Sequence, residues 1–475
     1  MHPSATHSWL PDLLFTGERF ESGLALVANG RGRITRLSRD PADLAAAQRL
    51  PGRALLPGFV NTHSHAFQRV IRGRTEFRSG PQRDTFWTWR EVMFRAAISL
   101  GPDDVYHASR MAFLEMALAG ITTVGEFHYL HRDPAGQPYA ERNTMALAVV
   151  RAARDVGLRI CLLHCAYARA GWRRAPSIAQ QRFIIASPDE YLATYDELRT
   201  RLASETAADL AWTGFAPHSV RAVPPDYLRA ILPTMRASGA PVQMHLSEQT
   251  DENEACLAEH DTTPIGLLER EGALHPAFTA VHAIHVANHE VGALARVGAH
   301  VCACPTTERS LGDGINPADT LAARGVRLAL GTDTNIQIEP LEDARELECH
   351  LRLKHLHRVV LAQPPPANAQ PRPAALAAGL LACATRHGAE SLHAPGGALE
   401  PGLAADFFTI DLDDPTLAGA DADALPAALV FGGGRACIRE VVIGGRPVLT
   451  DGRHPRQGEI VAGFQALQAR LWADP

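Results

Sequence analysis

Apolar runs with strand composition alternate with helical stretches through the middle of the chain. We expect strands at 55–63, 122–127, 159–163, 212–216, 241–245, 279–282, 300–303 and 327–330. Stretches with apolar residues at i, i+3 and i+4 separate or follow these runs, for example at 108–119, 140–156, 225–238 and 374–388. This alternation is typical of a parallel sheet built from βα units, and eight strands allow such a sheet to close. The pattern predicts an α/β protein with a distorted (β/α)8 TIM-like barrel.

The two ends of the chain contain further β-like runs. Short runs lie between glycines at 24–27 and 34–37, and others follow the barrel region at 405–410, 427–430 and 438–443. The N-terminal strands are too few to bury a sheet face alone, so we expect both ends to form one small β-sandwich. The predicted division is 1–57 and 397–475 for the sandwich and 58–396 for the barrel. A proline-rich stretch at 364–373 is expected to be a solvated loop.

Composition narrows the class of partner. The chain has 475 residues, 46 basic and 52 acidic, so a net charge of −6 gives no sign of a nucleic-acid-binding or membrane-binding surface. A small-molecule partner is expected, and a homodimer is left open. The N-terminus has no basic region followed by an apolar run, and the eight cysteines lack Cys-x-x-Cys spacing. We therefore expect a soluble cytoplasmic protein with reduced thiols.

Polar residues end several of the predicted strands. His63 and His65 are two residues apart, so in a strand their rings leave the same face and can hold one metal ion. Later apolar runs end in His245, His282 and Asp333, where a barrel strand delivers its side chain to the open face. Taken singly, these residues could also be loop or core histidines and a turn aspartate. Their shared position at strand ends favours one metal site.

Five motifs in order carry a resemblance to a known family. They are NTHSHAFQR at 61–69, FWTWRE at 86–91, EFHY at 126–129, APHSVRAV at 216–223 and CPTTE at 304–308. With the histidines and aspartate at the strand ends, they resemble the amidohydrolase superfamily and, within it, the formimidoylglutamate deiminases of histidine degradation. The resemblance covers nearly the whole chain and implies the same barrel and a hydrolytic activity.

The resemblance also implies a ligand set and catalytic residues. One divalent ion per chain is expected, with zinc favoured and iron or manganese as alternatives. Its ligands are expected to be His63, His65, His245 and Asp333. Glu248, in a His-x-x-Glu spacing, would shuttle protons, His282 would orient the attacking water, and Asp333 would accept its proton. His285, close to His282 in the sequence, is expected to be structural.

Substrate contacts follow from the same comparison. Gln68, Tyr129, His218 and Arg221 are expected to touch the substrate, with the Arg221 guanidinium binding a carboxylate. Arg90 is a weaker candidate for a carboxylate, and its neighbours Trp87 and Trp89 could pack the loop.

Two details qualify the resemblance. The chain contains a single lysine, Lys354, which lies after every predicted strand of the barrel. A centre of two metals bridged by a carbamylated lysine is therefore excluded. Asp333 is followed by Thr334 and Asn335, where the family is expected to have Ser-His, so a contact near the ligand could differ.

The expected reaction is hydrolysis of N-formimino-L-glutamate to N-formyl-L-glutamate and ammonia. The nearest alternative is a deaminase of the same barrel class that acts on a purine, pterin or triazine ring. Such an enzyme would share every ligand but would offer stacking aromatics and amide groups in place of Arg221 and His218. A non-catalytic barrel scaffold is a third alternative, although such relatives lose ligands that this chain retains.

Overall fold

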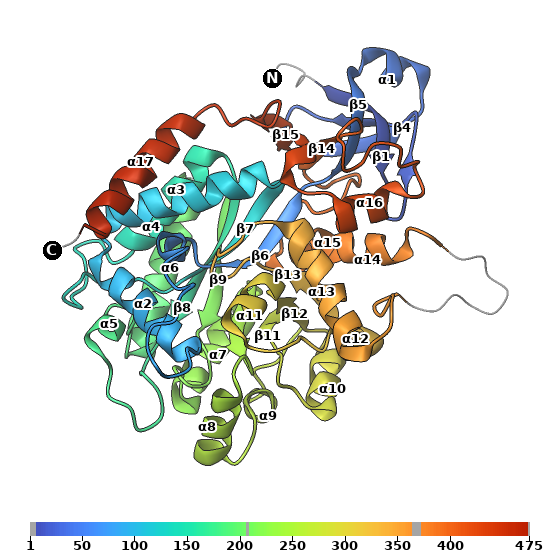
Figure 1. Ribbon diagram of the computed structural model, residues 1–475. Coiled ribbons are helices and arrows are strands. Elements are labelled where there is room, and N and C mark those ends of the chain that lie inside the picture. The colour runs from blue at the N-terminus through green and yellow to red at the C-terminus, as the bar shows by residue number, and fades with distance from the viewer. Residues whose placement is uncertain (1–5, 206–208, 363–371, 474–475) are drawn as a thin grey trace.

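A computed structural model describes residues 6–205, 209–362 and 372–473, and these residues form two eight-stranded sheets with surrounding helices (Figure 1). One sheet is a parallel barrel in which every paired neighbour has the same direction. Its strands are β6 (Phe59–Ser64), β7 (Ile121–His128), β8 (Arg159–Ala166), β9 (Ala211–Pro217), β10 (Val242–Leu246), β11 (Phe278–His282), β12 (His300–Ala303) and β13 (Arg327–Leu330). The predicted barrel is confirmed.

The first predicted strand, 55–63, is divided between the two sheets. Its beginning belongs to β5 (Gln48–Pro57) in the terminal sheet, and its remainder is β6 of the barrel. Gly58 lies at the crossing, where an added Cβ would stand 2.2 Å from Thr122 Oγ1. A glycine is therefore needed where the chain passes from one sheet to the other.

The barrel closes between its first and last strands at their C-terminal ends. Ser64 and Asp333 form a parallel bridge, the His65 amide donates to the Asp333 carbonyl at 2.9 Å, and the Asp333 amide donates to the His63 carbonyl at 3.0 Å. The backbone that closes the barrel therefore also carries three of the predicted metal ligands.

Helices cover the barrel on its outside (Figure 1). After β6 come η1 (Ala66–Ile71), α2 (Phe86–Ser99) and α3 (Pro102–Leu118), and after β7 and β8 come α4 (Thr144–Val156), α5 (Ile178–Gln181) and α6 (Pro188–Glu205). The second half has α7 (Pro225–Ser238), α8 (Thr250–His260), α9 (Pro264–Arg270), α10 (Asn288–Val297), α11 (Pro305–Leu311), α12 (Ala318–Ala323) and α13 (Pro340–His355). The predicted helix at 374–388 is two helices, α14 (Ala375–Cys383) and α15 (Arg386–Leu392), because the backbone leaves helical geometry at Thr385. The proline-rich stretch lies mostly outside the described residues.

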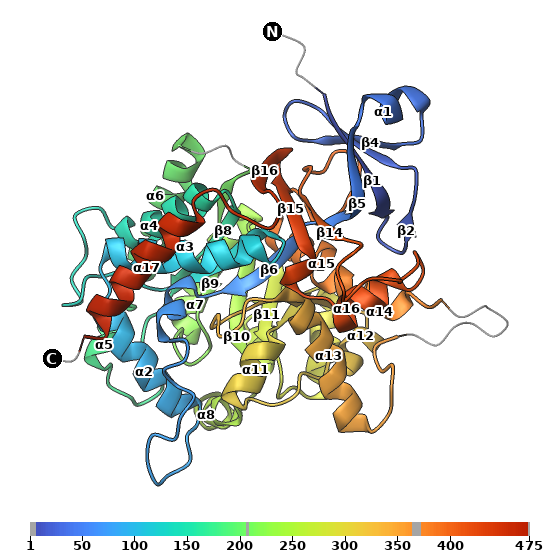
Figure 2. The ribbon, with the colours of Figure 1, turned by 45° about the horizontal axis from the view of Figure 1, so that its top comes forward.

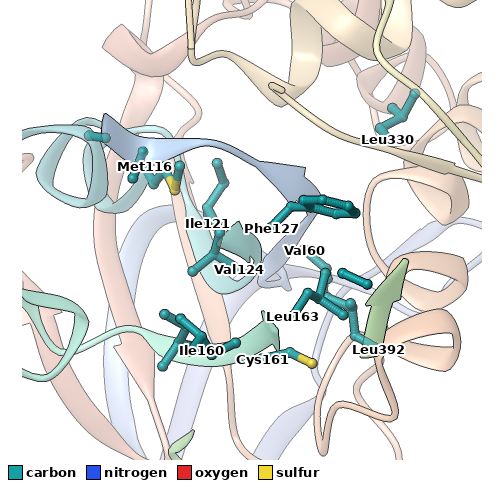
Figure 3. Close-up of a cluster of buried hydrophobic side chains, with 14 of the residues drawn as sticks. Val60, Met116, Ile121, Val124, Phe127, Ile160, Cys161, Leu163, Leu330 and Leu392 are labelled. Atoms are coloured by element: carbon teal, nitrogen blue, oxygen red, sulfur yellow. The ribbon is translucent and has the colours of Figure 1, made fainter. Parts of the chain in front are cut away.

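Apolar side chains join the strands to these helices. Figure 3 shows Val60, Val124 and Leu163 of neighbouring strands beside Met116 of α3 and Leu392 of α15. All five are at most 2% exposed. Burying a side chain of this size contributes roughly 1.5–3 kcal/mol. This packing keeps β6, β7 and β8 fixed relative to one another, so the strand ends present their polar residues at defined positions.

The second sheet combines both ends of the chain. Its order is β16 (Arg446–Leu449), β15 (Ile438–Ile443), β14 (Phe407–Asp411), β5, β1 (His7–Phe15), β3 (Ala25–Ala28) and β4 (Ile34–Ser38), with β2 (Phe20–Glu21) beside β1. Only β1 and β5 pair in parallel. Figure 2 shows the N-terminal strands in blue beside the C-terminal strands in red. Trp9, Leu26, Leu55 and Phe407 belong to a core separate from that of the barrel.

One predicted strand is wrong. Residues 427–430 lie in a helix, α16 (Leu425–Gly432), which has Pro426 in its first turn. A short apolar run cannot by itself distinguish a strand from a buried helix, and proline in the first turn favours the helix. The other short elements are α1 (Pro41–Ala46) and η2 (Arg435–Cys437).

The last helix, α17 (Gln457–Leu471), returns from the terminal sheet to the barrel and packs along α3 (Figure 1). Arg110 of α3 and Glu459 of α17 form an ion pair at 2.9 Å. Arg159 of β8 binds both carboxylate oxygens of Asp406 at 2.6 and 3.0 Å, a buried link between barrel and terminal segment. The division at 57 and 396 stays a proposal. Among the described residues, no helix has the length and apolar character that a membrane crossing needs.

Candidate metal centre and active site

The four predicted ligands meet at the C-terminal ends of the barrel strands. His65 Nε2 lies 3.2 Å from His63 Nε2 and 3.3 Å from His245 Nε2. Asp333 Oδ1 lies 3.5 Å from His63 Nε2 and 3.3 Å from His65 Nε2. All four side chains are buried, and their ligand atoms lie within 4.8 Å of one another. The structure therefore brings together groups from three distant parts of the sequence: the His63–His65 pair, His245 and Asp333.

Each of the three histidines has its other ring nitrogen engaged by an acceptor. His63 Nδ1 lies 3.0 Å from Gln243 Oε1, His65 Nδ1 lies 2.9 Å from the Phe127 carbonyl, and His245 Nδ1 lies 3.0 Å from the His218 carbonyl. A carbonyl can only accept, so each Nδ1 carries the proton and each Nε2 presents a lone pair. Gln243 is oriented by its own amide, which donates to the Thr62 carbonyl at 2.8 Å.

Three lone pairs and a carboxylate thus face one buried point. Burying these groups without a cation would cost free energy, because their lone pairs and charge would have no partner. Three nitrogens with one oxygen suit zinc or a similar divalent ion. Burial and the neighbouring His63 lower the pKa of His65 to about 3. Burial alone would raise the pKa of Asp333, but contact with His63 and attraction to His65 and His282 lower it to about 2. Neutral imidazole and ionised carboxylate are the forms that bind a metal.

His282 stands beside this point between carboxylates. Its Nε2 lies 3.7 Å from both Glu248 Oε1 and Asp333 Oδ2, and its Nδ1 lies 3.3 Å from Glu308 Oε1. Burial alone would lower the pKa of His282, but these carboxylates raise it well above its ordinary value. Burial raises the pKa of Glu248, which is what a proton shuttle needs at neutral pH. His285 points away, with Nε2 at 2.8 Å from the Asp313 carbonyl.

A narrow pocket opens onto the ligands. Its volume is about 50 Å³, and His65, His245, Asp333 and Glu248 form part of its wall. The remaining wall contains all five predicted substrate contacts: Gln68, Arg90, Tyr129, His218 and Arg221. A space of this size holds only one or two water molecules, so a larger ligand must move side chains aside. The structure therefore places the predicted substrate contacts and the metal ligands around the same space.

Polar atoms of this pocket lack partners. Gln68 donates from Nε2 to the Tyr129 hydroxyl at 2.8 Å, while its Oε1 is buried without a hydrogen bond among the described residues. Arg221 Nε is likewise buried and unpaired. Arg90 donates to the Tyr167 hydroxyl at 3.3 Å. Buried polar groups normally have hydrogen-bond partners, so the unpaired atoms of Gln68 and Arg221 indicate that the pocket binds a polar ligand.

The two arginines lie close to one indole ring. The guanidinium carbons of Arg90 and Arg221 are 5.4 and 5.9 Å from the ring centre of Trp87. Within the described residues, neither arginine has an ion pair with a carboxylate. Burial, together with the charge of Arg221, lowers the pKa of Arg90. Two cations that form no direct ion pair favour an anionic ligand.

Other cavities lie outside this site. A second space, of about 400 Å³, is lined by Trp87, Arg174 and Asp251, and Arg90 lines both this outer cavity and the pocket. A cavity of about 410 Å³ between α4 and β16 contains none of the ligand residues. It lies at the N-terminal ends of the strands, whereas barrel enzymes place their chemistry at the C-terminal ends.

Three contributors to the site were absent from the sequence-based prediction, and a fourth, Asn335, was named there only as a departure from the family. Gln243 is two residues before His245 in β10 and so shares its face, a signal that could have been read. Glu308 lies within the CPTTE motif. Asn335, which departs from the expected family residue, donates to Ser64 Oγ and to the Asp333 carbonyl, both at 3.1 Å, and so supports the ligand loop. The Phe127 carbonyl could not be found from sequence because any residue supplies one.

A closed parallel barrel with three histidines and an aspartate at its strand ends defines a metal-dependent hydrolase, and the chain belongs to the amidohydrolase family, whose profile matches residues 54–448. It is 38% identical to formimidoylglutamate deiminase of Pseudomonas aeruginosa over 91% of this chain and 92% of that one. A 5-methylthioadenosine/S-adenosylhomocysteine deaminase of Natronomonas pharaonis is 27% identical over 86% and 85% of the two chains. The crystal structure of an amidohydrolase from Brucella melitensis superposes with a TM-score of 0.88 at 31% identity, covering 98% of this chain and 100% of that one.

Proposed function

We propose that this protein hydrolyses N-formimino-L-glutamate to N-formyl-L-glutamate and ammonia. The observation that carries the proposal is the pair of half-buried guanidiniums, Arg90 and Arg221, in the pocket whose wall includes three of the predicted metal ligands. N-formimino-L-glutamate has two carboxylates and one amidine carbon, which match two cations and one hydrolytic centre. The 38% identity to a formimidoylglutamate deiminase supports the same substrate.

The resident ion is proposed to be one zinc per chain, held by His63, His65, His245 and Asp333. When bound there, it would lower the pKa of a water molecule at the site to about 7. Asp333 takes the proton of the attacking water at a carboxylate oxygen, and His282 orients that water through Nε2, which lies 3.7 Å from Asp333 Oδ2.

Glu248 completes the proton transfers. In its protonated form it donates to the imino nitrogen as water attacks the amidine carbon. Glu248 then passes the proton that Asp333 took from water to the leaving nitrogen, and the remaining hydroxyl proton restores protonated Glu248 as the formyl group forms. The carbon–nitrogen bond breaks, ammonia leaves, and the formyl oxygen comes from water. The raised pKa of Glu248, caused by burial, favours the protonated form that this donation needs.

Substrate orientation is assigned to the polar atoms without partners. Arg221 binds the α-carboxylate, Arg90 binds the side-chain carboxylate, and Gln68 Oε1 accepts a hydrogen bond from substrate nitrogen. Arg90 also forms the wall toward the outer cavity, so its movement would admit a substrate that the narrow pocket cannot otherwise hold. We propose that the reaction takes place in the cytoplasm. The homodimer stays a prediction.

A deaminase of a purine, pterin or triazine ring is the second candidate. Phe86 and Trp89 on the pocket wall could stack on a ring, and the Natronomonas pharaonis relative is a nucleoside deaminase. The two arginines count against it, because a neutral ring would leave both half-buried guanidiniums without an ion-pair partner among the described residues. A non-catalytic scaffold is disfavoured because the ligands, Glu248 and His282 all converge.

The test is ammonia release by zinc-loaded protein from formiminoglutamate, formiminoglycine, guanine and S-adenosylhomocysteine. The proposal expects formiminoglutamate to give the highest kcat/KM. Faster release from guanine or S-adenosylhomocysteine would overturn it in favour of a ring deaminase. No release from any of the four, with zinc bound, would contradict the proposed substrate.

A further inference from the structure

Glu308 is a buried acid that lies behind His282, on the side away from the predicted metal ligands. It is 2% exposed, and its Oε1 lies 3.3 Å from His282 Nδ1. The same oxygen accepts a hydrogen bond from the Cys304 amide at 2.9 Å. Cys304 precedes α11 and Glu308 belongs to its first turn, so the carboxylate is held by its own helix. One fixed oxygen therefore faces one nitrogen of the ring.

The opposite nitrogen of His282 has a different environment. Nε2 lies 3.7 Å from both Glu248 Oε1 and Asp333 Oδ2 and has no hydrogen bond within the described part of the chain. If the ring turned over by about 180°, a ring carbon would face Glu308, and the Nδ1–H···carboxylate hydrogen bond would be lost. Glu308 thus favours the one ring orientation that aims Nε2 at the reaction space.

The backbone of His282 is held separately. Its φ of 69° is in the left-handed region, which is costly for a residue with a side chain. The Asn316 side chain donates to the His282 carbonyl and supports this conformation. Backbone support from Asn316 leaves ring rotation about the Cβ–Cγ bond free, so ring orientation needs a partner of its own.

We propose that Glu308 is a positioning residue that sets the ring orientation of His282 and thereby the direction from which His282 Nε2 orients the attacking water. The proposal rests on the proposed role of His282. It resembles the way in which a buried carboxylate fixes the tautomer and direction of a general-base histidine in hydrolases of other folds. The competing explanation is that Glu308 only caps α11.

A matched control separates these explanations. Asp343 supports the same helix end, because its Oδ1 accepts from the Thr306 amide at 3.1 Å and from the Thr306 hydroxyl at 2.9 Å. It is also buried, and no hydrogen bond or ion pair links it to His282 among the described residues. Asp343→Asn therefore perturbs the start of α11 without touching the His282 ring.

The experiment is a double-mutant cycle with Glu308→Gln and His282→Asn. In the wild-type background, Glu308→Gln should lower kcat by about tenfold or more, because a charge-assisted hydrogen bond is replaced by a neutral one. KM and zinc content should change by less than about twofold. In the His282→Asn background the same change should alter the residual kcat by less than about twofold, since residues that act through one another are not additive.

Asp343→Asn should lower Tm while leaving kcat within about threefold of wild type, as expected for a change that affects stability alone. Glu308→Asp, which keeps the charge on a shorter side chain, serves if Glu308→Gln fails to fold, and its loss of kcat should also vanish in the His282→Asn background. An unchanged kcat in Glu308→Gln, or an equal loss with and without His282, would overturn the proposal.

Failure of the proposed substrate is a separate result. The cycle can be measured with whichever compound of the four-substrate panel the wild-type protein hydrolyses. An outcome in which another substrate is preferred and the coupling between Glu308 and His282 persists rejects the proposed function alone. An outcome in which formiminoglutamate is preferred and the coupling is absent rejects the positioning role alone.

Discussion

Two groups of side chains in the candidate site are held in different ways. The predicted metal face consists of His63, His65, His245 and Asp333, and the guanidinium face consists of Arg90 and Arg221. Each histidine of the metal face is oriented by an acceptor on a barrel strand or directly after one. The arginines come from α2 and the loop after β9, and they rest near Trp87 and Tyr167.

This difference separates chemistry from selectivity. In the proposed function, the metal face supplies the hydrolysis of a carbon–nitrogen centre, and a relative named for another substrate is 27% identical to this chain. In the same proposal, the guanidinium face selects which molecule is held there. Changes on the metal face should therefore affect every substrate, whereas changes on the guanidinium face should affect only substrates with carboxylates.

The largest effect is expected for His245→Ala on the metal face. Removing one of four ligands should leave far less than one metal ion per chain after dialysis, and ammonia release should fall to background because the water is no longer activated. Elemental analysis and the ammonia assay check this. His289→Ala, on the exposed surface of α10, is the control and should keep both metal and activity. Full metal content in His245→Ala would remove His245 from the ligand set.

Glu248→Gln should keep the metal and lose most of the turnover. General acid–base catalysis contributes about 10²–10⁴-fold, so kcat should fall by that range while zinc content stays constant. Glu254→Gln, an exposed change on α8, is the control. Loss of zinc in Glu248→Gln would make Glu248 a ligand, and near-normal turnover would assign the proton transfers to another group.

Arg221→Met tests the guanidinium face. Removing one partner of a buried charge pair costs about 2–5 kcal/mol, so kcat/KM for formiminoglutamate should fall by more than about thirtyfold. Zinc content should not change. Arg174→Met is the matched control. The guanidinium carbon of Arg174 lies 5.7 Å from the centre of the same Trp87 ring, but Arg174 does not line the pocket. Normal turnover by Arg221→Met would move the α-carboxylate contact to another residue such as Arg90.

The smallest effect is expected for Gln243→Leu, which removes the acceptor of His63 Nδ1. Loss of such a partner typically weakens metal binding by about 10–100-fold, while the fully loaded protein should retain most of its kcat. Competition with a chelator measures the affinity. Gln243→Glu retains an acceptor at this position and should bind zinc more tightly than Gln243→Leu. Equal affinity in both variants would show that the contact with His63 does not support the metal face.

Much of the fold and part of the candidate site could be predicted from the sequence. Apolar runs located the barrel strands, and the spacing of His63 and His65 indicated one shared face. The division of the first strand at Gly58 could not be predicted, because it depends on contact with Thr122 from another strand. The helix at 425–432 was missed because a four-residue apolar run has no resolvable period.

The sequence predicted the metal face better than the guanidinium face. Strand periodicity fixes the face on which a strand side chain lies, so the spacing of His63 and His65 indicated that they share a face. The complete ligand set was implied by the family resemblance. Arg90 and Arg221 could be proposed only through motif resemblance, because a loop arginine has no pattern that distinguishes it from a surface arginine. The absence of carboxylate partners among the described residues became visible only in three dimensions.

The most direct test of the account compares kcat/KM of wild-type protein for N-formimino-L-glutamate and formiminoglycine. Both compounds have the same amidine and an α-carboxylate, and only the first has a second carboxylate for Arg90. The account predicts that formiminoglutamate is preferred by at least about thirtyfold, the equivalent of about 2 kcal/mol for one buried charge pair. Equal values for the two compounds would contradict the claim that two arginines select a dicarboxylate substrate.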